Sequence, residues 1–328
     1  MRFTEYDADD ADLLEAGRTI VNAVQELETP WLPQFTPHRW AMQVRYGWDG
    51  SPERHLLAWA DGVPVGVAAV EVGEWDNPDL AWIDLHVHPD HRRRGHGSAF
   101  LAHLLELARE EGRSKIGVSG WELPATVAFA RHHDFKRAAE EIYRVVRLQA
   151  LSRSFVDDAY AEAAAFAHDY ELLRFEGQTP DELLAEVADI TEAINDAPTD
   201  DLDIEDEAFP AERVRAYEDA TINSGHRLYR VIARHRETGE LAGHTVVAVD
   251  AETPQLAHQH DTAVVRAHRG HRLGLLVKAE LMRWLAVAEP QLESIDTWNA
   301  ESNEQMIEVN ERLGYVRVSR ELEFQKRI

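Results

Sequence analysis

Hydrophobic and polar residues alternate along this chain with two distinct periods, one typical of strands and one typical of helices. The apolar run Leu56–Ala60, the turn Asp61–Gly62 and the run Val63–Val72 predict a β-hairpin. Across residues 97–111 the apolar residues instead recur every three or four positions, which predicts a helix with one buried face, ended by Gly112. Strand and helix patterns of this kind follow each other through the whole chain, so we expect a mixed α/β layer fold.

The same patterns predict further elements in chain order. In the first half we expect strands at 2–6, 81–88, 115–119 and 135–148, and helices at 11–27 and 125–133. In the second half we expect strands at 170–175, 228–233, 241–249 and 256–265, and a helix at 209–224. Another helix is predicted from Pro180 to Asn195, with Thr179 as its N-cap.

An internal repeat relates the two halves. DLHVHPDHRRRGHG at 84–97 and DTAVVRAHRGHRLG at 261–274 match at a constant offset, and an amphipathic run follows each of them. A second pair of segments also corresponds between the two halves: HHDFKRAAE at 132–140 and RLGYVRVSR at 312–320. We therefore predict two domains with the same fold, at 1–150 and 168–328, joined by a linker at about 151–167.

Composition narrows the class of protein. The formal net charge is −26, which disfavours nucleic-acid binding and would attract a cationic partner. The chain has no cysteine, so disulfides and a thiol nucleophile are excluded. No apolar run is long enough to span a bilayer, and the N-terminus is acidic rather than signal-like. We expect a cytoplasmic enzyme without membrane or nucleic-acid partners, either a monomer or a homodimer.

In both halves an apolar strand leads into a loop of arginines and glycines that opens a helix. Such a loop presents backbone N–H groups and the positive end of the helix dipole to an anion. Arginine side chains add charge, and glycine allows close approach to the ligand. The P-loop sequence GxxxxGK[ST] and the dinucleotide fingerprint GxGxxG after a first strand are both absent. These loops predict a pyrophosphate site of another kind.

The loop sequences resemble those of the GNAT (GCN5-related) N-acetyltransferases. RRRGHG at 92–97 looks like the family's [QR]xxGx[GA] pyrophosphate loop, and RGHRLG at 269–274 is similar, with Arg272 in place of the first glycine. WNAESNEQMIEVNERLGY at 298–315 resembles the family's C-terminal signature. The arrangement is similar to that of two-domain members such as mycothiol synthase. The resemblance implies two tandem GNAT domains, each a mostly antiparallel sheet with a splayed parallel strand pair and flanking helices.

The resemblance also implies which residues bind the co-substrate, acetyl-CoA or another acyl-CoA. The two loops would bind its pyrophosphate. The ends of the preceding strands would form backbone hydrogen bonds with its pantetheine arm, as with an added β-strand. An asparagine after the fifth strand, present only in the second half, would contact the arm. The implied cofactor-binding residues are Leu85, Val87, Arg92, Arg93, Arg94, Gly95, His96, Gly97, Val264, Val265, Arg269, Gly270, His271, Arg272, Leu273, Gly274, Asn299 and Asn303.

An amine that attacks a thioester must lose a proton, so a base is needed. Asp84 and Asp261 match across the repeat, and His86 and His260 lie close by on the same strands. These four are the candidate catalytic residues, and solvent-exposed strand positions are the alternative interpretation of each. His-x-His pairs at 86–88 and 258–260 could share a metal, but no third ligand is evident, so we predict no metal site.

The predicted function is transfer of an acetyl group from acetyl-CoA to a small-molecule primary amine. Two alternatives stay open: a non-catalytic acyl-CoA sensor, and a tRNA-dependent aminoacyltransferase, against which the acidic charge counts. The second half is favoured as the active one, because it carries the asparagines and an acidic stretch, DAPTDDLDIEDE at 196–207, expected to line its acceptor site. The acceptor, the acyl chain and the active domain are not fixed by the sequence.

Overall fold

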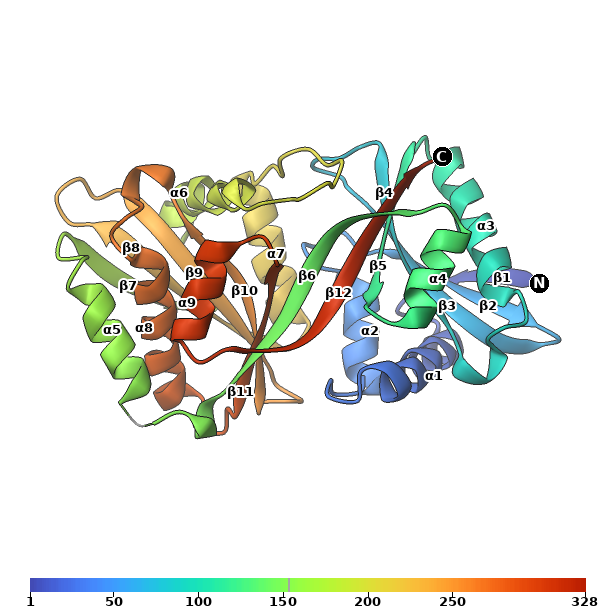
Figure 1. Ribbon diagram of the computed structural model, residues 1–328, viewed down its shortest axis with the longest axis horizontal. Helices are drawn as coiled ribbons and strands as arrows, with labels where there is room; N and C mark the ends of the chain where they lie inside the picture. The colour runs from blue at the N-terminus through green and yellow to red at the C-terminus, as the bar shows by residue number, and fades with distance from the viewer. Residues whose placement is uncertain (153) are drawn as a thin grey trace. The chain divides into compact units, whose positions relative to one another are not determined.

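The computed structural model describes residues 1–152 and 154–328 and divides the chain into two compact units. Unit 1 comprises residues 1–139, 201–205 and 321–328, and unit 2 comprises residues 140–200 and 206–320 (Figure 1). The sequence-based division at 1–150 and 168–328 follows the two copies of the repeat, whereas the compact units cut the chain elsewhere. Residue 153, in the predicted linker, lies outside the described residues.

Unit 1 is built on a mixed sheet with the strand order β1-β2-β3-β4-β5-β12. Neighbouring strands are antiparallel except β4 and β5, which are parallel. The strands are β1 (Arg2–Tyr6), β2 (Arg54–Ala60), β3 (Val63–Val72), β4 (Leu80–Val87), β5 (Lys115–Trp121) and the end of β12 (Val316–Arg327); the helices are α1 (Ala11–Glu28), α2 (Pro37–Tyr46), α3 (His96–Glu110) and α4 (Pro124–His132).

The two faces of this sheet bury different helices because side chains alternate along each strand. Leu57 and Val67 pack with α1 and α2, in a core that also holds Trp40. Leu56 and Ala68, one residue away on the same strands, pack with α3 and α4 on the opposite face. A three-layer arrangement of helices, sheet and helices results.

Unit 2 repeats this plan with the strand order β6-β11-β10-β9-β8-β7. Here β10 and β11 form the parallel pair. The strands are β6 (Lys136–Arg147), β7 (Tyr170–Glu176), β8 (His226–His235), β9 (Leu241–Asp250), β10 (Leu256–Val264) and β11 (Ser294–Ala300); the helices are α5 (Phe155–Ala164), α6 (Asp181–Thr191), α7 (Ala211–Asn223), α8 (Leu273–Ala288) and α9 (Glu304–Arg312).

The final strand of each copy completes the sheet of the other unit. Strand β6 ends the first copy, but from Glu141 to Arg147 it pairs with β11 of unit 2. Strand β12 ends the second copy, but from Glu321 to Arg327 it pairs with β5 of unit 1. Leu322 and Phe324 of β12 are buried in the core of unit 1. This exchange and the assignment of residues 201–205 to unit 1 are the reasons that the compact units differ from the sequence-based domains.

Most predicted elements are present with ends within two residues of those predicted, except that α6 ends at Thr191 and a 3₁₀ turn, Glu192–Asp196, follows it. The predicted fold class, two copies of a mixed sheet with a parallel strand pair and flanking helices, is confirmed. Two helices were missed. Helix α2 lies in a segment for which no element was predicted, and α5 lies in the predicted linker, where it packs on α8 (Figure 1). The predicted N-cap was also wrong: Pro180 is the N-cap of α6, and Thr179 Oγ1 hydrogen-bonds to Glu218 instead. Among the described residues no helix is long and apolar enough to cross a membrane.

Candidate functional site

In unit 1 the parallel strands β4 and β5 separate halfway along their length. Their pairing runs from Leu80 opposite Lys115 to Ile83 opposite Val118 and stops there. Beyond that point β4 stays bonded to β3 up to Val87, while its other edge faces the opening. Unpaired backbone N–H and C=O groups at such an edge can bond an extended ligand as an added strand.

Unit 2 has the same opening, with one difference. The pairing of β10 with β11 ends at His258 opposite Asp296. The register between β10 and β9 then shifts between Gln259 and Thr262, which is a β-bulge at residues 260 and 261. In unit 1 the corresponding register between β3 and β4 is continuous. The two strands therefore present their side chains differently, although their sequences align.

The loop at 92–97 opens the helix of unit 1 with two residues in the left-handed conformation. Arg93 has φ of 61° and Gly95 has φ of 85°, and α3 starts at His96. Arg93, Arg94 and Gly95 are exposed, and a Cβ added at Gly95 would meet no atom within 4 Å. Arg92 is turned inward, where it bonds Glu28 at 2.6 Å. Two exposed arginines without a carboxylate partner in the described part of unit 1 thus flank a helix N-terminus.

The loop at 269–274 in unit 2 has the same backbone with glycine and arginine exchanged. Gly270 has φ of 87° and Arg272 has φ of 55°. Its arginines are neutralised by the chain itself. Asp196 accepts from Arg269 at 2.6 Å and from Arg266 at 2.7 Å. Arg272 pairs with Glu162 of α5, and its guanidinium lies 4.0 Å from the ring centroid of Phe166.

The remaining loop and strand residues that the sequence assigned to cofactor binding take varied places. Leu85 and Val264 pack partly into the cores, and Val265 precedes a 3₁₀ turn. A Cβ at Gly97 would lie 3.2 Å from Phe129 and 3.5 Å from Val87, so this glycine permits close packing against α4 and β4 rather than facing the loop's open side. His96 and Leu273 are the first helical residues of α3 and α8, His271 is exposed, and a Cβ added at Gly274 would lie 4.0 Å from Val264.

Asp84 and His86 come together at the opening of unit 1. His86 Nε2 lies 3.1 Å from the Asp84 carboxylate, and the Asp84 side chain is 58% exposed. Desolvation by the surrounding protein would raise the pKa of Asp84. The charge of His86 and its hydrogen bond to Asp84 together have a larger effect, so the pKa of Asp84 is lowered. Desolvation likewise opposes the effect of Asp84 on His86, yet the pKa of His86 is raised. If Nε2 donates to Asp84, Nδ1 is left as the acceptor.

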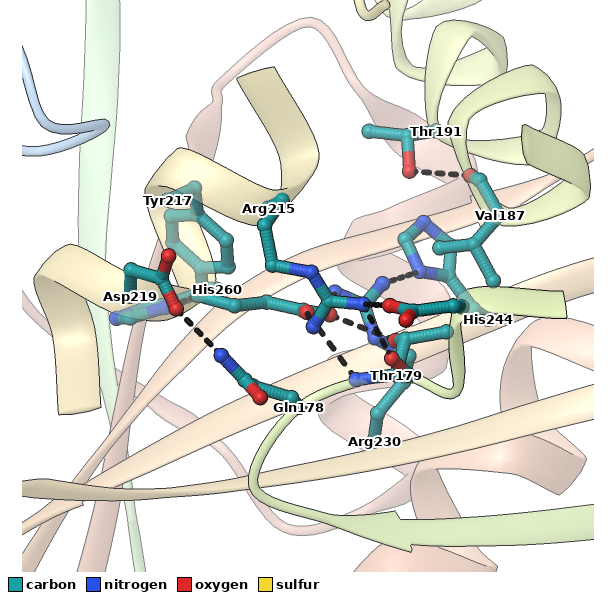
Figure 2. Close-up of polar contacts among 12 residues, drawn as sticks. Gln178, Thr179, Val187, Thr191, Arg215, Tyr217, Asp219, Arg230, His244 and His260 are labelled. Carbon is teal, nitrogen blue, oxygen red and sulfur yellow. Dashed lines mark hydrogen bonds and ion pairs between the residues drawn. The ribbon is translucent and has the colours of Figure 1, made fainter. Parts of the chain in front are cut away.

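Asp261 and His260 of unit 2 do not form such a pair. His260 Nδ1 hydrogen-bonds to the hydroxyl of Tyr217 on α7 (Figure 2). Burial lowers the pKa of His260 to about 3, with smaller contributions from His258, His226 and Arg230, so this imidazole is neutral. Asp261 is half-buried, and burial raises its pKa against the opposing charge of Arg230. The β-bulge at residues 260 and 261 thus places the side chains of the two unit 2 candidates in different surroundings.

A buried polar network lies behind the Tyr217–His260 pair, on the side of the sheet covered by α6 and α7. Arg230 Nη1 bonds His244 Nδ1 at 2.7 Å and its Nη2 lies 3.2 Å from Glu218 (Figure 2). Glu218 also accepts from the Thr179 hydroxyl at 2.6 Å. The sequence analysis missed this network. The sequence feature that indicates such a network is a charged or polar residue inside an apolar strand, as in LYRVIA and AGHTVV.

The two asparagines assigned to the cofactor arm have structural partners. Asn299 is buried, and its Oδ1 lies 3.2 Å from both Arg144 Nη1 and Asn310 Nδ2. Asn303 is the N-cap of α9, and its Oδ1 accepts from the backbone N–H of Met306 at 3.1 Å. Both side chains are thus held by contacts within the chain, and their role at the cofactor arm stays a prediction.

Replacing Asn303 with alanine is expected to lower the free energy of unfolding by about 1 kcal/mol, because an N-cap side chain satisfies a backbone N–H that alanine leaves bare. Chemical denaturation of the full chain measures this. Asn303→Asp, which keeps an acceptor, should retain wild-type stability. A loss of turnover in Asn303→Ala without loss of stability would instead support the role at the cofactor arm.

The acidic stretch 196–207 is held by defined contacts. Asp196 binds the arginines of the unit 2 loop, and residues 201–205 belong to unit 1. There Lys115 Nζ donates to the backbone carbonyl of Asp203 at 2.9 Å, and Asn77 Oδ1 accepts from the N–H of Glu205 at 2.8 Å. Within this stretch Asp196, Asp203 and Glu207 form ion pairs with basic side chains. No group of three or more His, Asp or Glu in the described residues is arranged to hold a metal ion.

Comparison with known proteins places these features in a family. The model of the acetyltransferase (GNAT) family matches residues 21–135 and 189–315, one match for each copy of the repeat, which together make up most of the chain.

Among curated relatives, mycothiol acetyltransferase of Stackebrandtia nassauensis is 34% identical over 99 residues, 29% of this chain and 31% of that protein. Mycothiol acetyltransferase of Nocardiopsis dassonvillei is 38% identical over 109 residues, 32% of this chain and 30% of that protein. These matches span about a third of each relative.

Among solved structures, a tandem GNAT protein from the clavulanic acid biosynthesis pathway, determined without AcCoA, is 25% identical with a TM-score of 0.81, covering 99% of this chain and 98% of that one. A GCN5-related N-acetyltransferase from Sphaerobacter thermophilus shares the fold at 14% identity and a TM-score of 0.69, covering 99% and 95%.

Proposed function

Because the chain belongs to the acetyltransferase (GNAT) family, we propose that it transfers an acetyl group from acetyl-CoA to the primary amine of a small molecule, with unit 1 as the active unit. The observation that carries the assignment to unit 1 is the difference between the two loops. The loop at 92–97 has exposed arginines and an open left-handed glycine, whereas the loop at 269–274 has its arginines paired with Asp196 and Glu162. The relatives' names support acetyl transfer as the reaction.

The residues of the unit 1 loop fit the pyrophosphate of acetyl-CoA. Backbone N–H groups at the start of α3 suit an anion, and the open space at Gly95 lets the anion approach the backbone. Arg93 and Arg94 would supply charge-assisted hydrogen bonds. The free edge of β4 between Asp84 and Val87 would bind the pantetheine amides. Acetyl-CoA, when bound, supplies the thioester that the amine attacks.

His86 is the proposed base, and Asp84 positions it. The carboxylate holds Nε2, which directs Nδ1 to accept the proton that the attacking amine loses. The same carboxylate stabilises the imidazolium that forms. The exposure of both side chains at the opening between β4 and β5 allows an acceptor to reach them. In unit 2 the candidate histidine, His260, is bonded to Tyr217 instead of to Asp261.

Reversing one charge in each loop tests the assignment. Arg94→Glu in unit 1 should weaken acetyl-CoA binding at least about tenfold, since a hydrogen bond between charged groups contributes roughly 1.5–3 kcal/mol. His271→Glu occupies the matching exposed position in unit 2 and should leave the affinity near wild type. Isothermal titration calorimetry of the full chain gives both the affinity and the stoichiometry, which we expect to be one.

Two equivalents of acetyl-CoA, or loss of binding in His271→Glu alone, would contradict the assignment to unit 1. Absence of any acetyl-CoA binding by the wild type would contradict the proposed function itself.

A further inference from the structure

The face of the unit 1 sheet toward α1 and α2 carries an ordered set of acceptor groups beside the proposed base. Strand register places His55, Ala69 and Asp84 in one row across β2, β3 and β4. The next row pairs Glu71 with Trp82, and extending the register of β2 by one residue puts Glu53 opposite Glu71. Ala69, the small residue between His55 and Asp84, is only half-buried. Solvent therefore reaches the small side chain of Ala69 between these polar residues.

The carboxylates in these rows crowd one another. Burial raises the pKa of Glu53 to about 7, and the charges of Glu71 and Asp84 add to this rise. Glu321 of β12 also feels the charge of Asp84, and burial raises its pKa. Like charges gathered in one place favour a bound cation, which relieves their repulsion.

His55 provides an independent sign of a ligand. Its side chain is 2% exposed, and neither ring nitrogen has a hydrogen bond in the described structure. Its Nε2 lies 3.6 Å from Glu53 Oε2, so the ring is directed at the carboxylate cluster. Burial lowers the pKa of His55 to about 4, against the opposing charge of Asp84, which keeps the ring neutral with one nitrogen as an acceptor. A buried polar group without a partner needs one from elsewhere.

We propose that Glu53, His55 and Glu71 bind a second ammonium group of the acceptor, so that the substrate class is diamines or longer polyamines. The inference rests on the proposed function, because it takes His86 as the place where the first amine reacts. An ammonium group has three N–H donors and no acceptor, which matches two carboxylates and a neutral imidazole nitrogen. Trp82 and the half-buried Ala69 leave an apolar surface for the methylenes between the amines.

The spacing of the rows sets the kind of acceptor. His86 lies one row from His55 and two rows from Glu71 along the strands. Since successive rows are about 6.7 Å apart at the usual strand rise, a site shared by His55 and Glu71 lies about 7–13 Å from His86. Two amines that reach both rows need several methylene groups between them. A simple alkylamine of the same length fills the apolar part of this path but brings no second cation to Glu53 and Glu71.

The test compares 1,6-diaminohexane with n-heptylamine, which has a similar length and one charge. Calorimetry on the full chain saturated with CoA should show at least tenfold tighter binding of the diamine. Glu53→Gln and Glu71→Gln should each remove most of that preference, by raising the dissociation constant of the diamine and leaving that of heptylamine unchanged. Glu110→Gln is the matched control, because Glu110 is exposed on α3, which packs on the opposite face of the sheet.

Equal affinity for the diamine and heptylamine overturns the proposal, as does a diamine affinity that both glutamine variants leave unchanged. Thermal melts of the variants separate a binding loss from misfolding, and Glu71, being exposed, is the safer of the two positions. Acetylation of heptylamine as fast as diaminohexane overturns the substrate class while sustaining the proposed function. Binding of the diamine without acetylation of any amine sustains the ammonium site and contradicts the proposed function.

Discussion

Replacing His86 with glutamine is expected to lower kcat by about a hundredfold or more, since a positioned general base typically contributes 10²–10⁴-fold to rate. Glutamine approximates the size of the side chain and can still bond Asp84, but it cannot accept a proton. Affinity for acetyl-CoA should stay near wild type, because the loop at 92–97 is untouched. Steady-state kinetics of thiol release with a saturating amine measure the change.

The pH dependence distinguishes His86 from Asp84. The neutral imidazole is the active form, and Asp84 raises the pKa of His86 above its usual value, so activity should rise with pH through that raised pKa. Asp84→Asn removes the charge that favours the imidazolium and should shift the rising limb to lower pH. Asp261→Asn, the matching change in unit 2, should leave the profile unchanged. A wild-type profile in Asp84→Asn, or loss of activity in Asp261→Asn, would place the chemistry in unit 2.

Removing residues 321–328 is expected to unfold unit 1, although these residues are the last of the chain. The deletion takes away the strand partner of β5 and the buried side chains Leu322 and Phe324. Truncating one buried leucine or phenylalanine costs about 2–5 kcal/mol, and the whole strand therefore approaches the roughly 5–15 kcal/mol that stabilises an ordinary domain. Limited proteolysis should cut residues 1–139 rapidly while much of 140–320 resists.

Phe324→Ala serves as a graded control, with an expected loss of about 3–5 kcal/mol and an intact sheet. If the truncated chain keeps a protease-resistant unit 1 and the wild-type melting temperature, the strand exchange does not hold unit 1 together.

The repeat and its loops were predictable because they depend on local chemistry. Glycine and arginine at the start of a helix, followed by apolar residues at helical spacing, define the same backbone in both copies. The strand exchange was not predictable in this way. Residues 135–148 and 316–327 both read as strands, and a strand pattern states which face is buried but not which neighbour is bonded.

In the candidate site, too, contacts between residues close in sequence were predictable and contacts between distant residues were not. Asp84 and His86 lie two residues apart on one strand, so their contact follows from strand periodicity. The partners that neutralise the second loop could not be foreseen, since Asp196 and Glu162 are distant in sequence from Arg269 and Arg272. Arg272 was seen as a bulky substitute for glycine, whereas the structure shows it in the left-handed conformation with its side chain held by Glu162 and Phe166.

The exchange of β6 and β12 also fixes an order of events on the ribosome. Strand β6 emerges before the rest of unit 2 and must wait for β11, while unit 1 lacks its last strand until β12 has been made. At about 5–20 residues per second, roughly ten seconds or longer pass between the emergence of β5 and that of its partner. During this interval the nascent chain exposes an unpaired edge of β5. Unit 1, although its first strands are synthesised early, therefore completes its sheet only after β12 has been made, about 200 residues after β5.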